Sequence, residues 1–500
     1  MRNAVPSSSK RWPAGPARGA LSGGDAGGCR SALAALLVAA CLGLASPAAN
    51  ARSLSARLDA ALRHPALRSA ELGILVEDEQ SELVLYERDP EKLLIPASSA
   101  KILTAIGVLS ALGPTHRFKT RVLTDRPPDA SGVVGRIAIV GGGDPVMNSE
   151  DWWRLAADLR RQGLRGVEGD VLVDDWLFDR EYWHPLWKGV SARAYHAPVS
   201  ALTANYGAFF VAVTPGRKKG DPVRVAVDPP ISYLRLSNLA VTGDARAKRT
   251  LSVRRTEPKE GAEVVSVRGV VRAGDEPDVF PRSVRAPALY AGAVFALQLE
   301  AVGIPVGGRV RRRTEELPHL LATHQGRPLS EIVELFMKYS NNSIAESLVK
   351  SLAVEAGHVP GSWPAGLAAL RVELGELGLL APGAVLVDGS GLSPDNRLSA
   401  RMLVDAIRAG GRSFGFGPEF VAAMPIAGRD GTLEHRAARS TDRVRAKTGL
   451  LGDQRVTALS GRALLADGDT VVFSILVNGH AGGSQAAMDA VDRFVAELTK

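Results

Sequence analysis

Apolar residues recur with two different periods along this chain of 500 residues. Near the N-terminus, the runs ELGILVED (71–78) and SELVLYER (81–88) predict the two strands of a hairpin. Near the C-terminus, RVTALSGRALLA (455–466) and TVVFSILVNGH (470–480) predict a second hairpin, because the tripeptide DGD between them is a strong turn signal. We therefore expect an antiparallel sheet that joins the two ends of the chain.

Helical spacing dominates the segments beside these strands. Apolar residues recur every three or four positions in five stretches that we expect to be helices of the same domain: 53–64, 101–112, 329–357, 399–411 and 484–500. From about 119 to 317 the chain instead has short β-like runs, and helical patterns there are few, mainly 150–163 and 286–303. We interpret this middle part as one or two mostly β insertions.

The N-terminus has the pattern of an export signal. Five basic residues and one acidic residue precede a continuous apolar run at 32–45, and Ala49-Asn50-Ala51 follows as an A-x-A site. These features predict a secretory signal peptide over 1–51 and an exported, periplasmic protein. The apolar run of 14 residues is too short for a typical transmembrane helix. Because its centre also resembles a lipoprotein cleavage site, we expect membrane association only if Cys41 is lipidated.

Composition narrows the possible chemistry. A hydrophobic content of 45% and a charged content of 23% are typical of a globular protein, and the length predicts two or three domains. Both cysteines, Cys29 and Cys41, precede the predicted cleavage site, which excludes a cysteine nucleophile from the mature chain. Half of the formal charge of +8 lies in the signal peptide. We expect RKK (217–219) and VRRRT (310–314) on solvated faces, and we expect no nucleic-acid partner, metal or cofactor.

The pattern S-x-x-K occurs three times. Ser98 and Lys101 stand at the start of the apolar helix predicted within 95–113, where a hydroxyl and an amine one turn apart share a face. A second copy lies in the signal peptide. The third, Ser347 and Lys350, lies within a predicted helix, where we expect Lys350 to be solvated. The pattern by itself does not distinguish a nucleophile and its base from a helix terminus.

Two further motifs follow the first copy in order. YSNNS contains Ser340 and Asn342, and RAKTGLL contains Lys447, Thr448 and Gly449. The order SxxK, SxN, KTG is that of serine acyl-transferases that act on D-alanyl-D-alanine peptides and β-lactams. Lys447 and Thr448 suit a substrate that ends in a carboxylate, and Gly449 lets the substrate backbone lie alongside a strand.

This chemistry needs these residue types. The hydroxyl of Ser98 becomes a nucleophile when a base takes its proton, and Lys101 serves as that base only if its pKa is lowered. Burial and a second cation, Lys447, would both lower that pKa. Backbone N–H groups at the helix start would stabilise the developing oxyanion. Ser340 can pass the proton to the leaving amine, and Asn342 can hold the amide of the substrate.

The chain resembles the low-molecular-mass class C penicillin-binding proteins, the D-alanyl-D-alanine carboxypeptidase/endopeptidase family that includes the type-4 enzymes. Four segments resemble this family in addition to the three motifs: IVGGGDPVM (139–147), YHAPVSALTANYGAFFVAVTPG (195–216), VDGSGLSPDNRLS (387–399) and MPIAGRDGTLEHR (424–436). The resemblance therefore covers most of the mature chain.

The resemblance implies an α/β (α+β) domain of the transpeptidase and β-lactamase type, an antiparallel sheet flanked by helices. It places this penicillin-binding catalytic domain in residues 52–118 and 318–500. It implies an insertion built as two mostly β domains, the outer one formed by 119–190 and 280–317 and the nested one by 191–279.

The resemblance also implies residue roles. Ser98 is the acylated nucleophile, Lys101 its base, and the backbone N–H groups of Ser98 and Leu450 form the oxyanion hole. The remaining members of the proton and substrate network are Ser340, Asn342, Lys447, Thr448 and Gly449. The implied ligands are peptidoglycan peptides that end in D-Ala-D-Ala and β-lactam antibiotics. Two departures concern substrate preference: Leu450 stands where the family often has Ser or Thr, and Pro394 where arginine is common.

Two other functions stay open at this point. A β-lactamase shares the three motifs but is a smaller protein, with a much shorter gap than the 242 residues between Ser98 and Ser340. A catalytically silent cell-wall-binding homologue is the second alternative, although all five side-chain positions hold competent residues. The sequence leaves open whether the implied serine-type carboxypeptidase also acts as an endopeptidase.

Overall fold

The computed structural model describes residues 47–256 and 262–500. The predicted signal peptide falls mainly on residues 1–46, which lie outside the described residues, and so does Cys41. In the described part of the chain, no helix combines the length and the apolar character that crossing a membrane requires.

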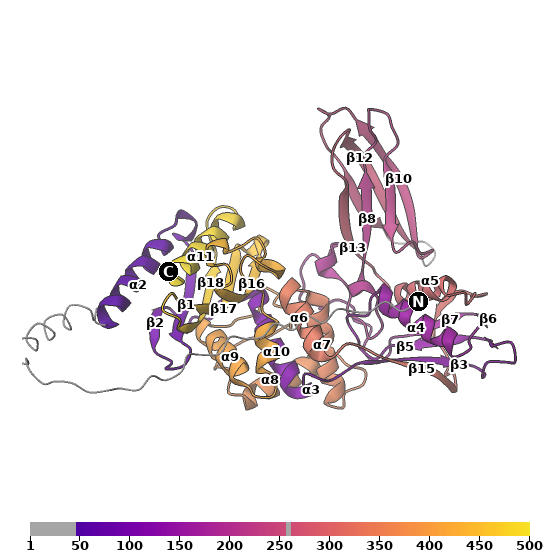
Figure 1. The fold of residues 1–500 in the computed structure, drawn as a ribbon, viewed down its shortest axis with the longest axis horizontal. Helices are drawn as coiled ribbons and strands as arrows, with labels where there is room; N and C mark the ends of the chain where they lie inside the picture. Colours follow the sequence, from indigo (N-terminus) through magenta and orange to yellow (C-terminus); the bar gives the residue numbers. More distant parts are fainter. Residues whose placement is uncertain (1–46, 257–261) are drawn as a thin grey trace, which may run out of the picture. The chain divides into compact units, whose positions relative to one another are not determined.

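The two ends of the chain form one antiparallel sheet, as the sequence predicts. Its strand order is β16-β17-β18-β1-β2 (Figure 1). Its strands are β1 (Glu71–Asp78), β2 (Val84–Arg88), β16 (Val444–Leu451), β17 (Val456–Leu464) and β18 (Thr470–Asn478). β2 begins later than the pattern predicts, because the Asp78 side chain accepts the backbone N–H groups of Gln80 and Ser81 and extends the turn.

Helices cover both faces of this sheet. Strand residues alternate between two apolar cores: Leu75, Val472 and Leu476 point into one, and Ile74 and Ile475 point into the other. The first core contains residues of α3 (Lys101–Leu112), α6 (Leu329–Tyr339), α7 (Asn342–Glu355), α8 (Trp363–Glu376), α9 (Ala400–Arg412) and α10 (Gly417–Ala422). The second contains residues of α2 (Pro47–Leu62) and α11 (Ser484–Leu498).

The middle of the chain forms separate, mostly β structure. One sheet has the order β14-β7-β5-β3-β15, and α4 and α5 pack on it. Two further sheets have the orders β13-β8-β9 and β10-β12-β11, and β4 pairs with β6. The helices are α4 (Ser149–Arg161) and α5 (Pro287–Ala301). The strands are β3 (Lys119–Thr124), β4 (Val133–Val134), β5 (Ile137–Val140), β6 (Gly166–Val167), β7 (Val171–Asp174), β8 (Ala208–Thr214), β9 (Arg224–Asp228), β10 (Leu234–Gly243), β11 (Ser252–Thr256), β12 (Glu263–Arg272), β13 (Asp278–Ser283), β14 (Val310–Arg312) and β15 (His319–Gln325).

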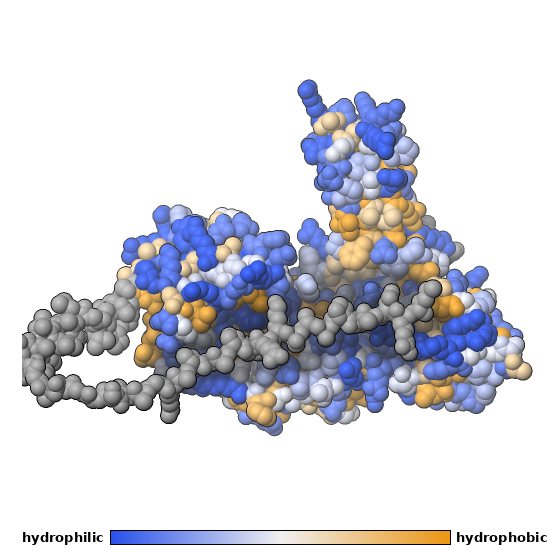
Figure 2. Space-filling view, in the orientation of Figure 1, coloured by the Kyte–Doolittle hydropathy of each residue, from blue (hydrophilic) through white to orange (hydrophobic). Residues whose placement is uncertain are grey.

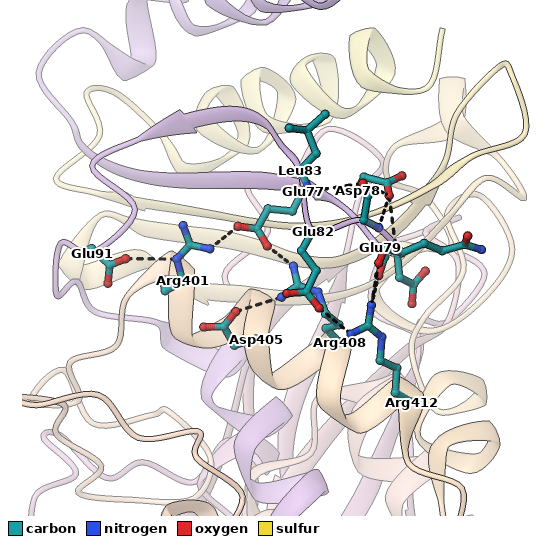
Figure 3. A network of polar contacts seen from close by, with 12 residues as sticks. Glu77, Asp78, Glu79, Glu82, Leu83, Glu91, Arg401, Asp405, Arg408 and Arg412 are labelled. Carbon is teal, nitrogen blue, oxygen red and sulfur yellow. Dashed lines mark hydrogen bonds and ion pairs between the residues drawn. The ribbon is translucent and has the colours of Figure 1, made fainter.

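A buried ion-pair network attaches α9 to the terminal sheet (Figure 3). Glu77 of β1 is only 2% exposed, and its carboxylate pairs with Arg401 and Arg408, which lie two turns apart on one face of α9. Arg401 also pairs with Glu91 at 3.2 Å, and Arg408 with Asp405 at 3.2 Å. Removing one partner from such a buried network leaves an uncompensated charge, which is strongly destabilising. The network therefore fixes α9 against the terminal sheet. It thereby also positions the loop that precedes α9, and this loop reaches the candidate active site.

An exposed apolar patch lies on the sheets of the middle part. Figure 2 shows apolar residues gathered over β8 and β13. Phe210 and Val279 on these strands are 48% and 59% exposed, and Leu239 on β10 is 60% exposed. Single exposed apolar residues are ordinary, but a group of this kind leaves an apolar sheet face open to solvent.

Candidate active site

Ser98 lies on a short 3₁₀ turn, Ala97–Ala100, that leads directly into α3. Ala97 has a φ of 47°, a left-handed conformation that is uncommon for a residue other than glycine. Two glycines permit close packing against this turn. A Cβ at Gly391 would collide with the Ala97 carbonyl oxygen, and a Cβ at Gly449 would lie 2.9 Å from the Pro96 carbonyl oxygen. The surrounding loop and strand thus hold the Ser98 backbone in place.

Lys101 is the first residue of α3, and its side chain is completely buried. Its Nζ atom lies 3.0 Å from Ser98 Oγ and donates to Asn342 Oδ1 and to the Ser390 carbonyl, both at 2.7 Å. Burial lowers the pKa of Lys101 to about 7, while the negative charges of Asp388 and Glu346 act in the opposite direction. The amine is therefore available in its neutral form near neutral pH.

The second motif occupies a break between two helices. The pattern at 329–357 predicts helix throughout, but α6 ends at Tyr339 and α7 begins at Asn342. Ser340 adopts a left-handed conformation at the end of α6, and the Asn341 side chain caps α7 by accepting the Ile344 N–H. The break turns the motif toward Lys101.

Asn342 uses both ends of its amide within the protein. Its Oδ1 accepts the hydrogen bond from Lys101, and its Nδ2 donates to the Tyr195 carbonyl at 3.0 Å. Tyr195 belongs to the mostly β middle part of the chain, which we expect to be an insertion. The contact therefore links the insertion to the lysine beside Ser98.

The third motif lies on β16, the edge strand of the terminal sheet. Lys447 is buried, and its Nζ donates to Ser340 Oγ at 2.8 Å and to the Thr448 carbonyl at 2.7 Å. Thr448 Oγ1 donates to Thr432 Oγ1 at 2.8 Å. Leu450, in contrast, is 46% exposed.

The causes of the lowered pKa values of the two active-site lysines differ from those that the sequence predicts. Burial, and after it the positive charge of Lys101, lowers the pKa of Lys447 well below its ordinary value. The pKa of Lys101 is lowered by burial and raised by two carboxylates, so the predicted contribution of Lys447 to this shift is not found.

A cleft of about 570 Å³ opens onto these groups. Ser98, Ser340 and Asn342 line it together with Leu450 and Pro394, the two positions where the chain departs from the expected pattern. The structure thus brings all three motifs to one cleft. Lys101 and Lys447 lie behind its surface and contact the lining hydroxyls from below.

Comparison with known proteins agrees with this arrangement. The family described as D-Ala-D-Ala carboxypeptidase 3 (S13) matches residues 54–498. The chain belongs to this family. The resemblance predicted from the motifs is thereby confirmed.

Similar proteins match over most of their length. A D-alanyl-D-alanine carboxypeptidase of Actinomadura sp. (strain R39) is 37% identical over 95% of this chain and 92% of its own. The carboxypeptidase DacB of Haemophilus influenzae is 24% identical over 82% of this chain and 86% of its own. The crystal structure of penicillin-binding protein 4 (dacB) from Haemophilus influenzae, 23% identical, has a TM-score of 0.74 and covers 90% of this chain and 98% of its own. The S13 fold, predicted as a transpeptidase-type domain, is confirmed.

Sequence reasoning missed a buried carboxyl behind the site of this S13 protein. Glu346 lies on α7 one turn after Asn342 and is fully buried. Its Oε1 accepts the Ser390 N–H at 2.8 Å, and its Oε2 accepts the Gly389 N–H at 3.2 Å and Trp363 Nε1–H at 2.9 Å. The Ser390 carbonyl accepts the hydrogen bond from Lys101, so Glu346 anchors, through the Ser390 N–H, the residue whose carbonyl contacts the lysine. An acidic residue at helical spacing after Asn342 was the available signal.

Asp388 supports the same loop from its other side. Its carboxylate accepts the Gly391 N–H at 2.7 Å, the Ser393 N–H at 2.6 Å and Trp187 Nε1–H at 3.0 Å. Burial, and after it the negative charge of Asp388, raises the pKa of Glu346 to about 7. The loop at 388–393 thus rests on two buried carboxyl groups, and Glu346 titrates near neutral pH.

The third S-x-x-K copy differs from expectation. Lys350 is completely buried rather than solvated. Its Nζ pairs with Asp179, donates to the Glu181 carbonyl at 2.8 Å and lies 3.7 Å from the centre of the Trp363 ring. The inserted segment that contains Asp179 covers this part of α7, and only the tertiary structure reveals it. No contact joins Lys350 to Ser98 in the described part of the chain, so this copy is structural.

Proposed function

We propose that the chain is a serine-type D-Ala-D-Ala carboxypeptidase, a DD-endopeptidase or both, which cleaves peptidoglycan stem peptides through an acyl-enzyme on Ser98. The observation that carries the proposal is the 3.0 Å contact between Ser98 Oγ and the buried amine of Lys101, whose pKa is lowered to about 7. A hydroxyl beside an amine that can be neutral is an activated nucleophile. Membership of the S13 family supports the same assignment.

The proposed reaction has two stages. Ser98 Oγ attacks the carbonyl carbon of the penultimate D-alanine while Lys101 takes the hydroxyl proton, and the N–H groups of Ser98 and Leu450 stabilise the oxyanion. The C–N bond then breaks, and the terminal D-alanine leaves as an amine that receives a proton through Ser340. Water next attacks the ester, releases the shortened peptide and restores Ser98.

The remaining residues bind the substrate. Lys447 and Thr448 form the site for the terminal carboxylate, and Gly449 lets the peptide backbone approach β16. Asn342 holds the substrate amide, and its contact with Lys101 at 2.7 Å supports a second role in orienting the base. A β-lactam acylates Ser98 by the same attack, which opens its ring and leaves no departing amine. In support, the Haemophilus influenzae protein has also been crystallised with a β-lactam.

Export and domain division complete the proposal. We propose that residues 1–51 direct the protein to the periplasm, with lipidation at Cys41 as the route to membrane association. We propose a catalytic domain of 52–118 and 318–500 with the insertion between them. Separate sheets support this division, although β15 (His319–Gln325) pairs with β3 of the inserted part. The catalytic segment therefore contributes one strand to the insertion.

Labelled penicillin and purified peptidoglycan test the proposed function. The purified protein is expected to form a stable adduct, located on Ser98 by mass spectrometry of peptides, and Ser98→Ala is expected to form none. On peptidoglycan, loss of one D-alanine from monomers identifies the carboxypeptidase, and conversion of dimers to monomers identifies the endopeptidase. A protein without adduct and products would be a silent cell-wall-binding homologue, and rapid turnover of the drug would identify a β-lactamase.

The pKa of Lys101 predicts the pH dependence of acylation. Because the neutral amine is the base and its pKa is about 7, the acylation rate is expected to rise about tenfold per pH unit below 7 and to level off above it. Stopped-flow measurement of the second-order rate of acylation by a fluorescent penicillin between pH 5 and 9 would show this. A rate that keeps rising until pH 10 would contradict the assignment.

A further inference from the structure

A second and larger cleft lies away from Ser98. Its volume is about 800 Å³, and none of the predicted site residues lines it. Leu112 at the end of α3, Glu355 at the end of α7 and the face of the sheet around Arg121 and Val140 form its walls. A cleft of this size is typical of ligand sites in proteins.

The cleft carries an excess of positive charge. Arg117, Lys119 and Arg121 line it, and none of the three forms an ion pair with a carboxylate in residues 47–256 and 262–500. Lys119 and Arg121 are two positions apart on β3, so both project from the same face of the strand, and both are exposed. Neighbouring like charges without counter-ions create a positive potential that attracts anions.

The other charged groups offset these three cations only in part. Asp174 on β7 is occupied by Arg313, which lines the same cleft, at 2.6 Å. Glu355 is the remaining carboxylate of the lining. Arg313 belongs to the run VRRRT, for which the sequence predicted solvated faces; it is instead only 18% exposed. With Asp174 paired, one carboxylate faces the three cations of β3 and of the residues just before it, and the cleft keeps an excess of positive charge.

An aromatic side chain borders the same cleft. Trp176 is 59% exposed, and the guanidinium of Arg180 lies 4.4 Å from its ring centre. An exposed indole offers a flat apolar surface with a polar edge, which suits the C–H face of a sugar ring. Cations beside a partly exposed aromatic ring fit a ligand that has both carboxylates and sugar rings.

Two elements connect this cleft with the Ser98 site. Helix α7 runs from Asn342 to Glu355, and its 14 residues span roughly 20 Å at 1.5 Å per residue. The chain from Trp176 to Tyr195 spans the same interval, because Trp176 lines the second cleft and the Tyr195 carbonyl contacts Asn342. A polymer chain can reach both sites, whereas a short peptide in the Ser98 cleft cannot reach the second.

We propose that this cationic cleft is a second binding site for peptidoglycan, which holds a carboxylate-bearing stem peptide and its sugar while Ser98 acts on another part of the polymer. The inference rests on the proposed function, because it takes the polymer as the substrate. It assigns the cleft to retention of the polymer and leaves the chemistry of Ser98 unchanged.

A charge-reversed variant tests the proposal. In Lys119→Glu with Arg121→Glu, no ion pair of the folded protein is lost, because both residues are exposed and unpaired. The matched control is Lys218→Glu with Lys219→Glu, which makes the same charge change at exposed residues of the nested part. Both pairs are introduced into Ser98→Ala, and co-sedimentation with insoluble peptidoglycan is measured. We expect about tenfold weaker binding for the cleft variant and less than a twofold change for the control.

Further measurements distinguish the possible outcomes. With Ser98 intact, penicillin acylation should be the same in both charge variants, while release of products from intact peptidoglycan should fall only in the cleft variant. Trp176→Ala should also weaken sedimentation. Equal loss in the control, unchanged sedimentation of the cleft variant, or equal displacement by double-stranded DNA would each overturn the proposal. If wild-type protein forms no penicillin adduct, the proposed function fails, and the sedimentation result then reports on binding alone.

Discussion

Replacing Lys101 with methionine is expected to reduce the rate of Ser98 acylation by about 10³- to 10⁴-fold. General-base catalysis supplies an effect of about this size, and methionine fills similar space without an amine. Lys101→Arg is expected to be as inactive as Lys101→Met, because a guanidinium stays protonated at any pH the protein tolerates. The second-order rate of acylation by labelled penicillin measures both variants.

The buried Lys350 provides a matched control. Lys350→Met also removes a fully buried amine, with its pair to Asp179, but this amine makes no contact with Ser98. Both methionine variants leave buried hydrogen-bonding partners unsatisfied, which lowers the free energy of unfolding by about 1–3 kcal/mol for each group. Both should therefore lower the midpoint temperature of thermal unfolding. Only Lys101→Met should lose acylation after correction for folded protein. Retention of acylation within tenfold of wild type in Lys101→Met would exclude Lys101 as the base.

Replacing Glu346 with glutamine is expected to slow the acylation of Ser98 by about 10- to 100-fold. It is also expected to move the acid limb of the pH–rate profile, the range in which the acylation rate rises with pH, to lower pH. Glu346 accepts three N–H groups, and glutamine must direct its own NH₂ group at one or more of them. This leaves a donor unpaired and disturbs Ser390, whose carbonyl contacts Lys101. The sign of the pH effect follows from charge. A negative Glu346 raises the pKa of Lys101, so its removal lowers that pKa.

The charged groups around Glu346 define the control for this experiment. Asp388 raises the pKa of Glu346, and Glu346 in turn raises the pKa of Lys350 and of Lys101. Trp363→Phe removes one donor to Glu346 and keeps the carboxyl group, so its acid limb should stay near that of the wild type. Rates of penicillin acylation from pH 5 to 9 measure all three proteins. A limb that does not move in Glu346→Gln would show that Glu346 has no electrostatic effect on the base.

Local pattern predicted much of the framework correctly. Short apolar runs bounded by turn signals predicted β1, β17 and β18, because a strand that is covered on both faces is apolar along most of its length. Three- and four-residue spacing predicted α3, α9 and α11 for the corresponding reason. The pairing of the two chain ends followed from the hairpin signals and is confirmed by the register of β1 with β18. The three motifs predicted family membership, since each is a short local pattern.

The arrangement of the site depended on contacts that no local pattern encodes. Ser340 lies at a helix break where apolar spacing continues without interruption, because capping by Asn341 and packing against β16 outweigh helix propensity there. Periodicity could not distinguish Lys101 from Lys350, since both face inward only after other segments cover them. Glu346 and Asp388 received no role because their donors come from loops and from the insertion.

Motif identity, element type and family were therefore readable from the chain, because they depend on residues close in sequence. The depressed pKa of Lys101, the carboxyl groups beneath its loop and the cationic cleft at the far end of α7 were decided by tertiary structure. Burial and charge proximity are properties of the packed molecule, and the chain brings residues 98, 340 and 447 together only when the terminal sheet and its helices close around them.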